Sequence, residues 1–119
     1  MAAPLLIVGA GIAGACAAFE LSRMYDGPVH VFEAGRPAAG ASGAAAGLIN
    51  PLMGRSASPV WRLKETLAAT HRLLSDAGAA RLLTGNGVLR PAVEPDQVDA
   101  FQEAAERFPD LATWLSPAE

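Results

Sequence analysis

A glycine-rich stretch near the N-terminus has the residue types and spacing of a phosphate-binding turn. Residues 9–14 read GAGIAG, a G-x-G-x-x-G pattern that follows an apolar run and precedes a segment with helical periodicity. In such a pattern Gly9 permits a tight turn, Gly11 lets the backbone approach a pyrophosphate, and Gly14 lets the helix pack on the strand. The N-terminus of the helix adds unpaired N–H groups and a positive dipole end. The pattern therefore predicts a dinucleotide site.

A carboxylate stands where such a site needs one for the adenosine ribose. Glu33 lies 19 residues after Gly14, at the end of a second expected strand over residues 29–33. An acid at this point hydrogen-bonds the ribose hydroxyls, and its charge disfavours the 2′-phosphate of NADP. The alternative interpretation is a glycine-rich turn followed by a solvated glutamate that binds nothing. The two features occur in register, which favours the dinucleotide site but leaves both FAD and NAD open.

A run of small residues then favours FAD over NAD. Residues 40–49 read GASGAAAGLI and lie within residues 34–58, a loop-like segment rich in Gly, Ala, Pro and Ser. A loop of this length inside a compact domain is usually functional or disordered. Small residues let backbone atoms pack on a flat or phosphate-bearing ligand, and the Ser42 hydroxyl can hydrogen-bond it. The alternative interpretation of this run is a flexible linker.

Together these motifs resemble the D-amino acid oxidase-like family of FAD-dependent oxidoreductases, to which glycine and sarcosine oxidases belong. In that family a G-x-G-x-x-G turn and a ribose-binding acid are followed by a segment of the form A-S-G…A-G-[LMI], which residues 41–43 and 46–48 match. The resemblance implies that FAD is the cofactor and that a defined set of residues contacts it. They are Gly9, Gly11 and Gly14 in the turn, Ile12 and Ala13 at the pyrophosphate, Glu33 and Ala34 at the ribose, Ala41 and Ser42 at the diphosphate and ribityl chain, and Ala46, Gly47 and Leu48 at the isoalloxazine ring.

The resemblance is good over residues 3–60 and loose beyond them. Members of the family are much longer, with a substrate-binding sheet and a second cofactor-binding stretch, so the chain is expected to be the N-terminal FAD-binding portion of a larger two-domain fold. Residues 1–60 would form the FAD-binding βαβ unit with its flavin-contact loop. Residues 61–119 would form a helix–hairpin–helix continuation at the start of the substrate-side region.

The implied activity is oxidation of the C–N bond of an amine or amino acid, with hydride transfer to the flavin. A small-molecule amine or amino acid would be the substrate of the intact protein. No residue of the chain is assigned a catalytic role, so the resemblance leaves open whether the chain by itself is an enzyme. Two alternatives remain: an NAD-binding dehydrogenase or sensor domain that uses the same fingerprint, and a non-catalytic truncated fragment.

The hydrophobic patterns around these residues predict an α/β fold with a Rossmann-like FAD/NAD(P)-binding βαβ unit. Residues 5–8 are an apolar run without polar alternation, which predicts a strand buried on both faces in the middle of a sheet. Residues 12–25 predict a helix and residues 29–33 a parallel strand. The rest of the chain is expected to add a helix from Ser58 to about Gly78, a hairpin of residues 81–84 and 88–90 around Gly85-Asn86-Gly87, and a helix over residues 95–107.

The expected sheet is incomplete, because only residues 29–33 are available as a parallel neighbour for residues 5–8. An exposed apolar edge strand is an association site. We therefore expect the chain on its own to self-associate or to need a partner chain, and not to retain FAD.

Composition excludes several other classes of protein. The 119 residues are 51% hydrophobic and 18% charged, with a net charge of −3, which is not the composition of a disordered chain. The basic residues form no stripe, so no nucleic-acid partner is expected. No group of His, Cys, Asp and Glu has the spacing of metal ligands, so no metal is expected. A lone cysteine, and an uncharged N-terminal stretch broken by proline and glycine, predict a cytoplasmic protein without a targeting or membrane segment.

Three further side chains are expected to have structural rather than functional roles. Trp61 and His71 are expected to be packing residues, with His71 partly buried on a helix face. Arg55 is expected to be a solvated arginine rather than the ligand of a substrate carboxylate.

Overall fold

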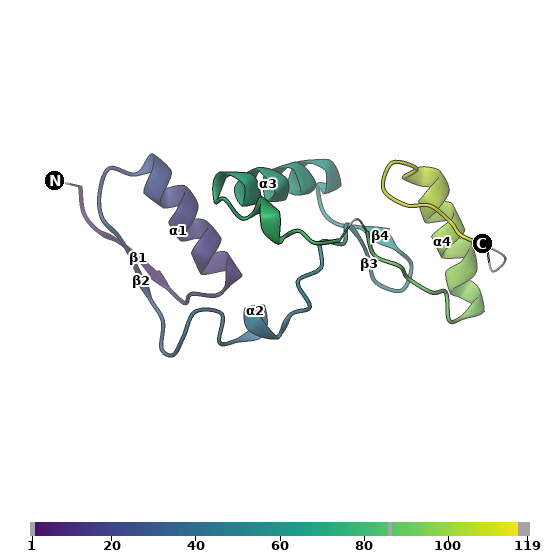
Figure 1. Cartoon of the computed structure of the whole chain (residues 1–119), viewed down its shortest axis with the longest axis horizontal. Coiled ribbons are helices and arrows are strands. Elements are labelled where there is room, and N and C mark those ends of the chain that lie inside the picture. Colours follow the sequence, from purple (N-terminus) through teal and green to yellow (C-terminus); the bar gives the residue numbers. More distant parts are fainter. Residues whose placement is uncertain (1, 86, 117–119) are drawn as a thin grey trace. The chain divides into compact units, whose positions relative to one another are not determined.

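The computed structural model describes residues 2–85 and 87–116. These residues form an α/β structure that divides into two units, Met1–Leu48 and Ile49–Glu119, each with its own two-stranded sheet (Figure 1). No helix of the described residues is long and apolar enough to cross a membrane.

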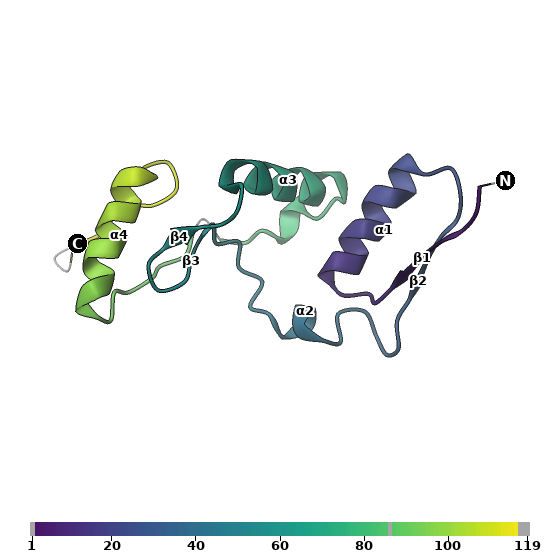
Figure 2. The same cartoon turned by 180° about the vertical axis from the view of Figure 1, so that it is seen from behind.

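The first unit is a strand–helix–strand arrangement. Strand β1 (Leu5–Val8) and strand β2 (Val29–Phe32) are parallel neighbours, and helix α1 (Ile12–Met24) connects them. Both views show α1 lying along this pair of strands (Figures 1 and 2), and the helix contacts both strands. The helix begins at Ile12, within the glycine-rich stretch, so that Gly14 lies in its first turn, and it ends where Tyr25 takes an extended conformation. The predicted βαβ unit is confirmed.

Strand β1 is not buried on both faces, which corrects the expectation from its apolar sequence. It pairs residue for residue with β2, from Leu5 opposite Val29 to Val8 opposite Phe32. Leu6 and Val8 are 63% and 89% exposed, whereas Leu5 and Ile7 are half-buried. In the described part of the chain β2 is the one strand paired with β1, and α1 packs on this pair. Side chains on the face away from α1 are therefore largely exposed.

The second unit is built around an antiparallel pair of short strands, β3 (Leu52–Met53) and β4 (Ser58–Pro59), with Leu52 opposite Pro59. Helix α3 (Leu63–Asp76), the 3₁₀ turn η1 (Ala80–Leu82) and helix α4 (Pro95–Arg107) follow in the sequence. The core is small, and its buried members come from β3, the turn between β3 and β4, and both helices: Leu52, Ala57, Leu63 and Ala104, with Phe101 and Phe108 packed against them.

Helix α4 is confirmed at its predicted bounds, and local sequence signals explain why. Pro95 occupies the first turn, where its missing N–H costs nothing. Glu94 and Gln97 form a capping box, in which each side chain accepts a hydrogen bond from the backbone N–H of the other. Phe108 ends the helix in a non-helical conformation, just before Pro109.

The helix predicted from Ser58 begins later, at Leu63. Ser58 and Pro59 are instead the two residues of β4, and the chain turns at Arg62, whose φ of 48° lies in the left-handed region. Proline is compatible both with the first turn of a helix and with a short edge strand. The Ser-Pro pair therefore fits either structure, and its pairing with β3 decides for the strand. The helix ends at Asp76, and Gly78, with a φ of 67°, follows as expected.

The hairpin predicted over residues 81–90 is wrong for the part that the structure describes. Residues Ala80–Leu82 form a 3₁₀ turn, and residues 83–85 and 87–90 contain no strand. Asn86, at the centre of the predicted turn, lies outside the described residues. The segment is held in another way, because the Arg90 side chain donates to the carbonyl groups of Leu52 and Gly54.

Two other expectations are also corrected. The segment over residues 34–58 is not all loop, since it contains the short helix α2 (Ala41–Ala44), β3 and the first residue of β4. Trp61, expected to pack, is 77% exposed, and His71 is exposed on α3.

Candidate cofactor site

The three glycines of the turn are each required for a different reason. Gly9 has a φ of 99°, which L side chains rarely adopt. A Cβ at Gly14 would collide with the carbonyl oxygen of Gly9, so this glycine allows α1 to pack directly on the end of β1. A Cβ at Gly11 would lie 3.0 Å from the Ser42 hydroxyl oxygen. The turn is therefore a surface of bare backbone that a phosphate can approach.

The N-terminus of α1 presents hydrogen-bond donors next to this turn. The Ala15 N–H makes the first helical bond, to the Gly11 carbonyl at 2.9 Å, and the Ile12 N–H donates to Ser42 Oγ at 2.8 Å. Within residues 2–85 and 87–116, the N–H groups of Ala13 and Gly14 have no acceptor. Ile12 and Ala13 are also exposed. Two unpaired donors at the positive end of a helix form a favourable place for an anion.

The Glu33 carboxylate lies against the same turn, directly after β2. Its Oε2 accepts from the Ala10 N–H at 2.9 Å and its Oε1 from the Gly35 N–H at 3.0 Å. These bonds, the one from Ala10 above all, hold the pKa of Glu33 below its ordinary value, so the group is a carboxylate at neutral pH. A carboxylate has about four acceptor positions. The two bonds to Ala10 and Gly35 do not use them all, so the carboxylate can also accept from a ribose hydroxyl, and Ala34 lies exposed beside it.

One hydrogen bond to α2 and one from the segment before it join this part of the chain to the glycine turn, and the sequence does not reveal either. Ser42 caps α1 through Ile12, and the Ala38 N–H donates to the Ala10 carbonyl at 2.9 Å. A Cβ at Gly43 would collide with the Ala38 carbonyl, so the small residue at this point lets α2 fold back on the chain before it. The structure thus brings Ser42, and Ala41 next to it, to the glycine turn. Ala38 was not among the residues that the sequence singled out.

The structure does not bring the rest of the small-residue run to this place. Ala46, Gly47 and Leu48 are exposed, and no hydrogen bond of the described residues joins them to the turn or to Glu33. Gly47 has a φ of 69°, so the chain bends there in a way that favours glycine. Contact of these residues with a flavin ring stays a prediction.

The glycine turn, the start of α1 and Glu33 together have the groups needed to bind the ADP half of a dinucleotide. Bare backbone at Gly9 and Gly11 and two unpaired N–H groups suit a pyrophosphate, and an ionised Glu33 suits the ribose diol. In the described residues no group of His, Cys, Asp and Glu is placed to hold a metal ion.

Comparison with known proteins decides the family. The family model described as FAD dependent oxidoreductase matches residues 5–119, nearly the whole chain. The chain belongs to the FAD-dependent oxidoreductases. The cofactor of this family is FAD. The glycine fingerprint left both FAD and NAD open, and membership of the family decides for FAD.

Two curated proteins are similar to this FAD-dependent oxidoreductase chain. Both are named tRNA 5-methylaminomethyl-2-thiouridine biosynthesis bifunctional protein MnmC. The protein from Delftia acidovorans is 35% identical over 113 residues and that from Maricaulis maris is 36% identical over 115 residues. Each match covers 94% of this chain but 17% of the relative, so the chain spans about a sixth of their length. No solved structure matches the chain significantly.

Proposed function

We propose that the chain binds FAD as part of an enzyme that oxidises the C–N bond of an amine or amino acid. In this proposal the glycine turn and α1 hold the pyrophosphate, Glu33 holds the adenosine ribose, and residues 41–48 contact the ribityl chain and flavin. The observation that carries it is the grouping of the Glu33 carboxylate, two unpaired N–H groups and the Ser42 hydroxyl around one turn of bare backbone.

The amine substrate is supported by chemistry that the family and the relatives share. When bound, FAD supplies a hydride acceptor for the C–H bond next to the amine nitrogen, and the substrate leaves as an imine that water hydrolyses. The names of both relatives contain a methylaminomethyl group, which is an amine. The residues of this chain contribute by binding and orienting the cofactor.

Cofactor binding is tested by calorimetric titration with FAD, ADP and NADP, on the protein purified with any polypeptide that accompanies it. FAD and ADP should bind, and NADP should bind more weakly, because its 2′-phosphate would meet the Glu33 carboxylate. Equal binding of all three ligands, or of none, would contradict the proposed site.

The substrate class is tested separately, on the protein purified with any polypeptide that accompanies it. Secondary amines and amino acids, added without oxygen in the presence of FAD, should bleach the visible flavin absorbance, and matching alcohols should not. Binding of FAD without bleaching by any amine would instead support the non-catalytic alternative.

A further inference from the structure

A cavity within the second unit lies between helix α4 and the turn that connects β3 to β4. Its volume is about 220 Å³. The side chains that line it come from both sides: Ser56, Ala57 and Ser58 from the turn and β4, and Glu103, Ala104, Arg107 and Phe108 from α4 and the residue that ends it. Charged, hydroxyl and apolar groups therefore meet in one small space.

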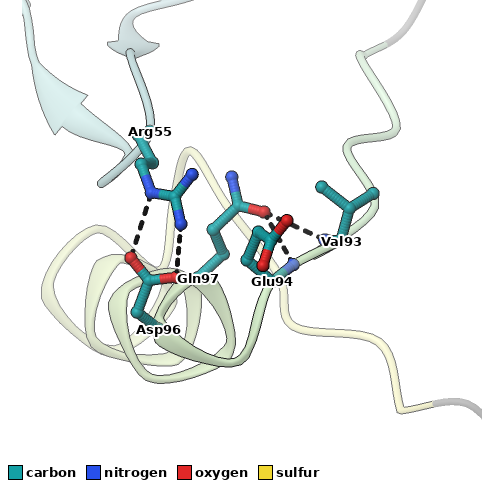
Figure 3. A network of polar contacts seen from close by, with 5 residues as sticks. All are labelled: Arg55, Val93, Glu94, Asp96 and Gln97. Carbon is teal, nitrogen blue, oxygen red and sulfur yellow. Dashed lines mark hydrogen bonds and ion pairs between the residues drawn. The ribbon is translucent and has the colours of Figure 1, made fainter.

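Two arginines join the two sides of this cavity. Arg55 lies in the same turn, and its guanidinium faces the Asp96 carboxylate at the start of α4 in a two-pronged ion pair (Figure 3), with distances of 3.0 Å and 2.7 Å. The pair lowers the pKa of Asp96, but its side chains are 60% and 64% exposed, and exposed pairs contribute little to stability. The half-buried Arg90 donates to two carbonyl groups of β3 and the turn, and it lies over the ring of Phe101 on α4, 4.7 Å from its centroid. The two sides are thus held together without a ligand.

The turn is held in a conformation that few residues with a side chain adopt. Ala57 has a φ of 49°, in the left-handed region, and is 8% exposed. Such a conformation persists where the surrounding structure enforces it, and it occurs most often at functional sites. The Ala57 N–H donates to the Gly54 carbonyl at 3.3 Å. The backbone that carries Ser56 and Ser58 is therefore fixed on both sides of Ala57.

The polar groups of the cavity have unused hydrogen-bonding capacity. Glu103 and Arg107 are four residues apart on α4, a spacing at which opposite charges commonly pair. In the part of the chain that the structure describes they do not pair, and Glu103 and both serine hydroxyls have no polar partner. Arg107 lies over the ring of Phe108, 5.2 Å from its centroid. Both signs of charge are therefore available to a ligand.

We propose that this cavity binds a small free α-amino acid in its zwitterionic form. The planar guanidinium of Arg107 suits the carboxylate of the ligand, and Glu103 suits its ammonium group. The nitrogen and the carboxyl carbon of an α-amino acid are about 2.5 Å apart, and the Cβ atoms of residues i and i+4 of a helix about 5–6 Å. One molecule can therefore reach both side chains, with its own side chain against Ala104 and Phe108.

The opposite charges exclude simpler ligands. A carboxylate without an amine would meet repulsion from Glu103, and an amine without a carboxylate would meet repulsion from Arg107. The volume of about 220 Å³ is below the usual range for pockets that hold cofactors or drug-sized ligands. It leaves room for an aliphatic side chain such as that of valine. This proposal does not depend on the proposed function, because every lining residue belongs to the second unit.

A series of three ligands tests the proposal on the protein purified with any polypeptide that accompanies it. The ligands are L-valine, isobutylamine, which lacks the carboxylate, and isovalerate, which lacks the amine. Saturation-transfer NMR titrations measure each Kd. L-Valine should bind about tenfold more tightly than either half, the ratio that one hydrogen bond to a charged group supplies. Equal binding of the three ligands, or no binding of L-valine, would overturn the proposal.

Substitutions locate the site. Glu103→Gln and Arg107→Gln keep the length of the side chain and remove its charge, and each should raise the Kd for L-valine about tenfold. Glu106→Gln and Arg72→Gln are the matched controls, because both residues are exposed on helices and neither lines the cavity. The controls should leave the Kd unchanged. Helical circular dichroism checks that each variant folds, and the ligand series on the unaltered protein decides if a variant does not.

The outcomes separate this site from the proposed cofactor site. All four variants should leave the Kd for ADP unchanged. If Glu103→Gln and Arg107→Gln bind L-valine as well as the unaltered protein, the amino acid binds elsewhere and the proposal is wrong. If L-valine binds as expected but FAD and ADP do not bind, the proposed function fails and the amino acid site stands.

Discussion

Backbone N–H groups alone orient the Glu33 carboxylate and keep it ionised. Its two oxygens accept from Ala10 and Gly35, so the side chain is already oriented against the glycine turn. No positively charged partner is needed to keep it ionised, because the N–H groups lower its pKa. A carboxylate held in this way attracts hydroxyl groups and repels phosphates, which is the selectivity that a ribose without a 2′-phosphate requires.

Replacement of Glu33 tests this role directly. Glu33→Ala should raise the Kd for ADP several-fold, because the ribose hydroxyls lose the carboxylate that accepts from them. Calorimetry with ADP measures the change. Glu65→Ala is the control, because Glu65 is an exposed glutamate on α3 paired with Arg62.

The pH dependence provides a second measurement on the same group. The folded-state pKa of Glu33 is lowered, so its contribution is fully present above the unfolded-state pKa and is lost as pH falls through the folded-state pKa. ADP binding should thus persist to a lower pH than an ordinary glutamate allows. Loss of binding within the ordinary range of a glutamate would mean that another acid holds the ribose.

Gly11 carries a separate prediction about the phosphate turn. Gly11→Val should abolish binding of both FAD and ADP, because a branched side chain fills the space of the pyrophosphate and presses on Ser42 Oγ, 3.0 Å from the new Cβ. Gly40→Ala is the control, since a Cβ there meets open space and the residue has a φ of −90°. An unchanged affinity of the valine variant for ADP would refute the assignment of the turn.

At the scale of the elements, α4 depends on a small number of polar contacts at its start. Gln97 Oε1 accepts from the N–H groups of Val93 and Glu94, at 2.9 Å and 3.1 Å (Figure 3). Gln97→Ala removes both, and at about 0.5–1.5 kcal/mol per net bond it should destabilise the second unit measurably in urea unfolding followed by circular dichroism. Gln102→Ala, an exposed glutamine on the same helix, should have no such effect.

The elements that could be predicted are those with their signals close together in sequence. The βαβ unit and α4 have turns, caps and prolines at their own ends, and both are confirmed. Ser58 and Pro59 fit a helix start and an edge strand equally well, so pairing with Leu52 and Met53 had to decide. The Ser42–Ile12 hydrogen bond joins residues 30 positions apart, and no local sequence pattern predicts such a contact. Glu33 was predictable because its role depends on one strand end.

At the scale of the whole molecule, the uncovered side of β1 leads to a prediction about association. Leu6 and Val8 are largely exposed, and β1 has a paired strand on one edge only among the described residues. A polypeptide of these 119 residues should therefore dimerise or aggregate, and should release FAD during gel filtration. Sedimentation and flavin counting measure both.

Charge on the exposed face provides the control for this prediction. The double variant Leu6→Lys, Val8→Lys should be more monomeric, because lysine on an edge strand opposes pairing with another chain. If the unaltered polypeptide is a monomer that unfolds cooperatively and carries stoichiometric FAD, the prediction is wrong and residues 49–119 complete the site in another way.

The hydrogen bond between Ser42 and Ile12 affects how the glycine turn can donate hydrogen bonds to a negatively charged ligand. A serine hydroxyl has one hydrogen to donate and two lone pairs that accept. Ser42 Oγ accepts from the helix, so its own hydrogen is left to donate, and accepting a bond makes that hydrogen a stronger donor. The Ser42 hydroxyl therefore extends the hydrogen-bonding capacity of the first N–H of α1 to a second donor. Unlike the backbone N–H, this O–H can rotate about its C–O bond to point at an incoming oxygen.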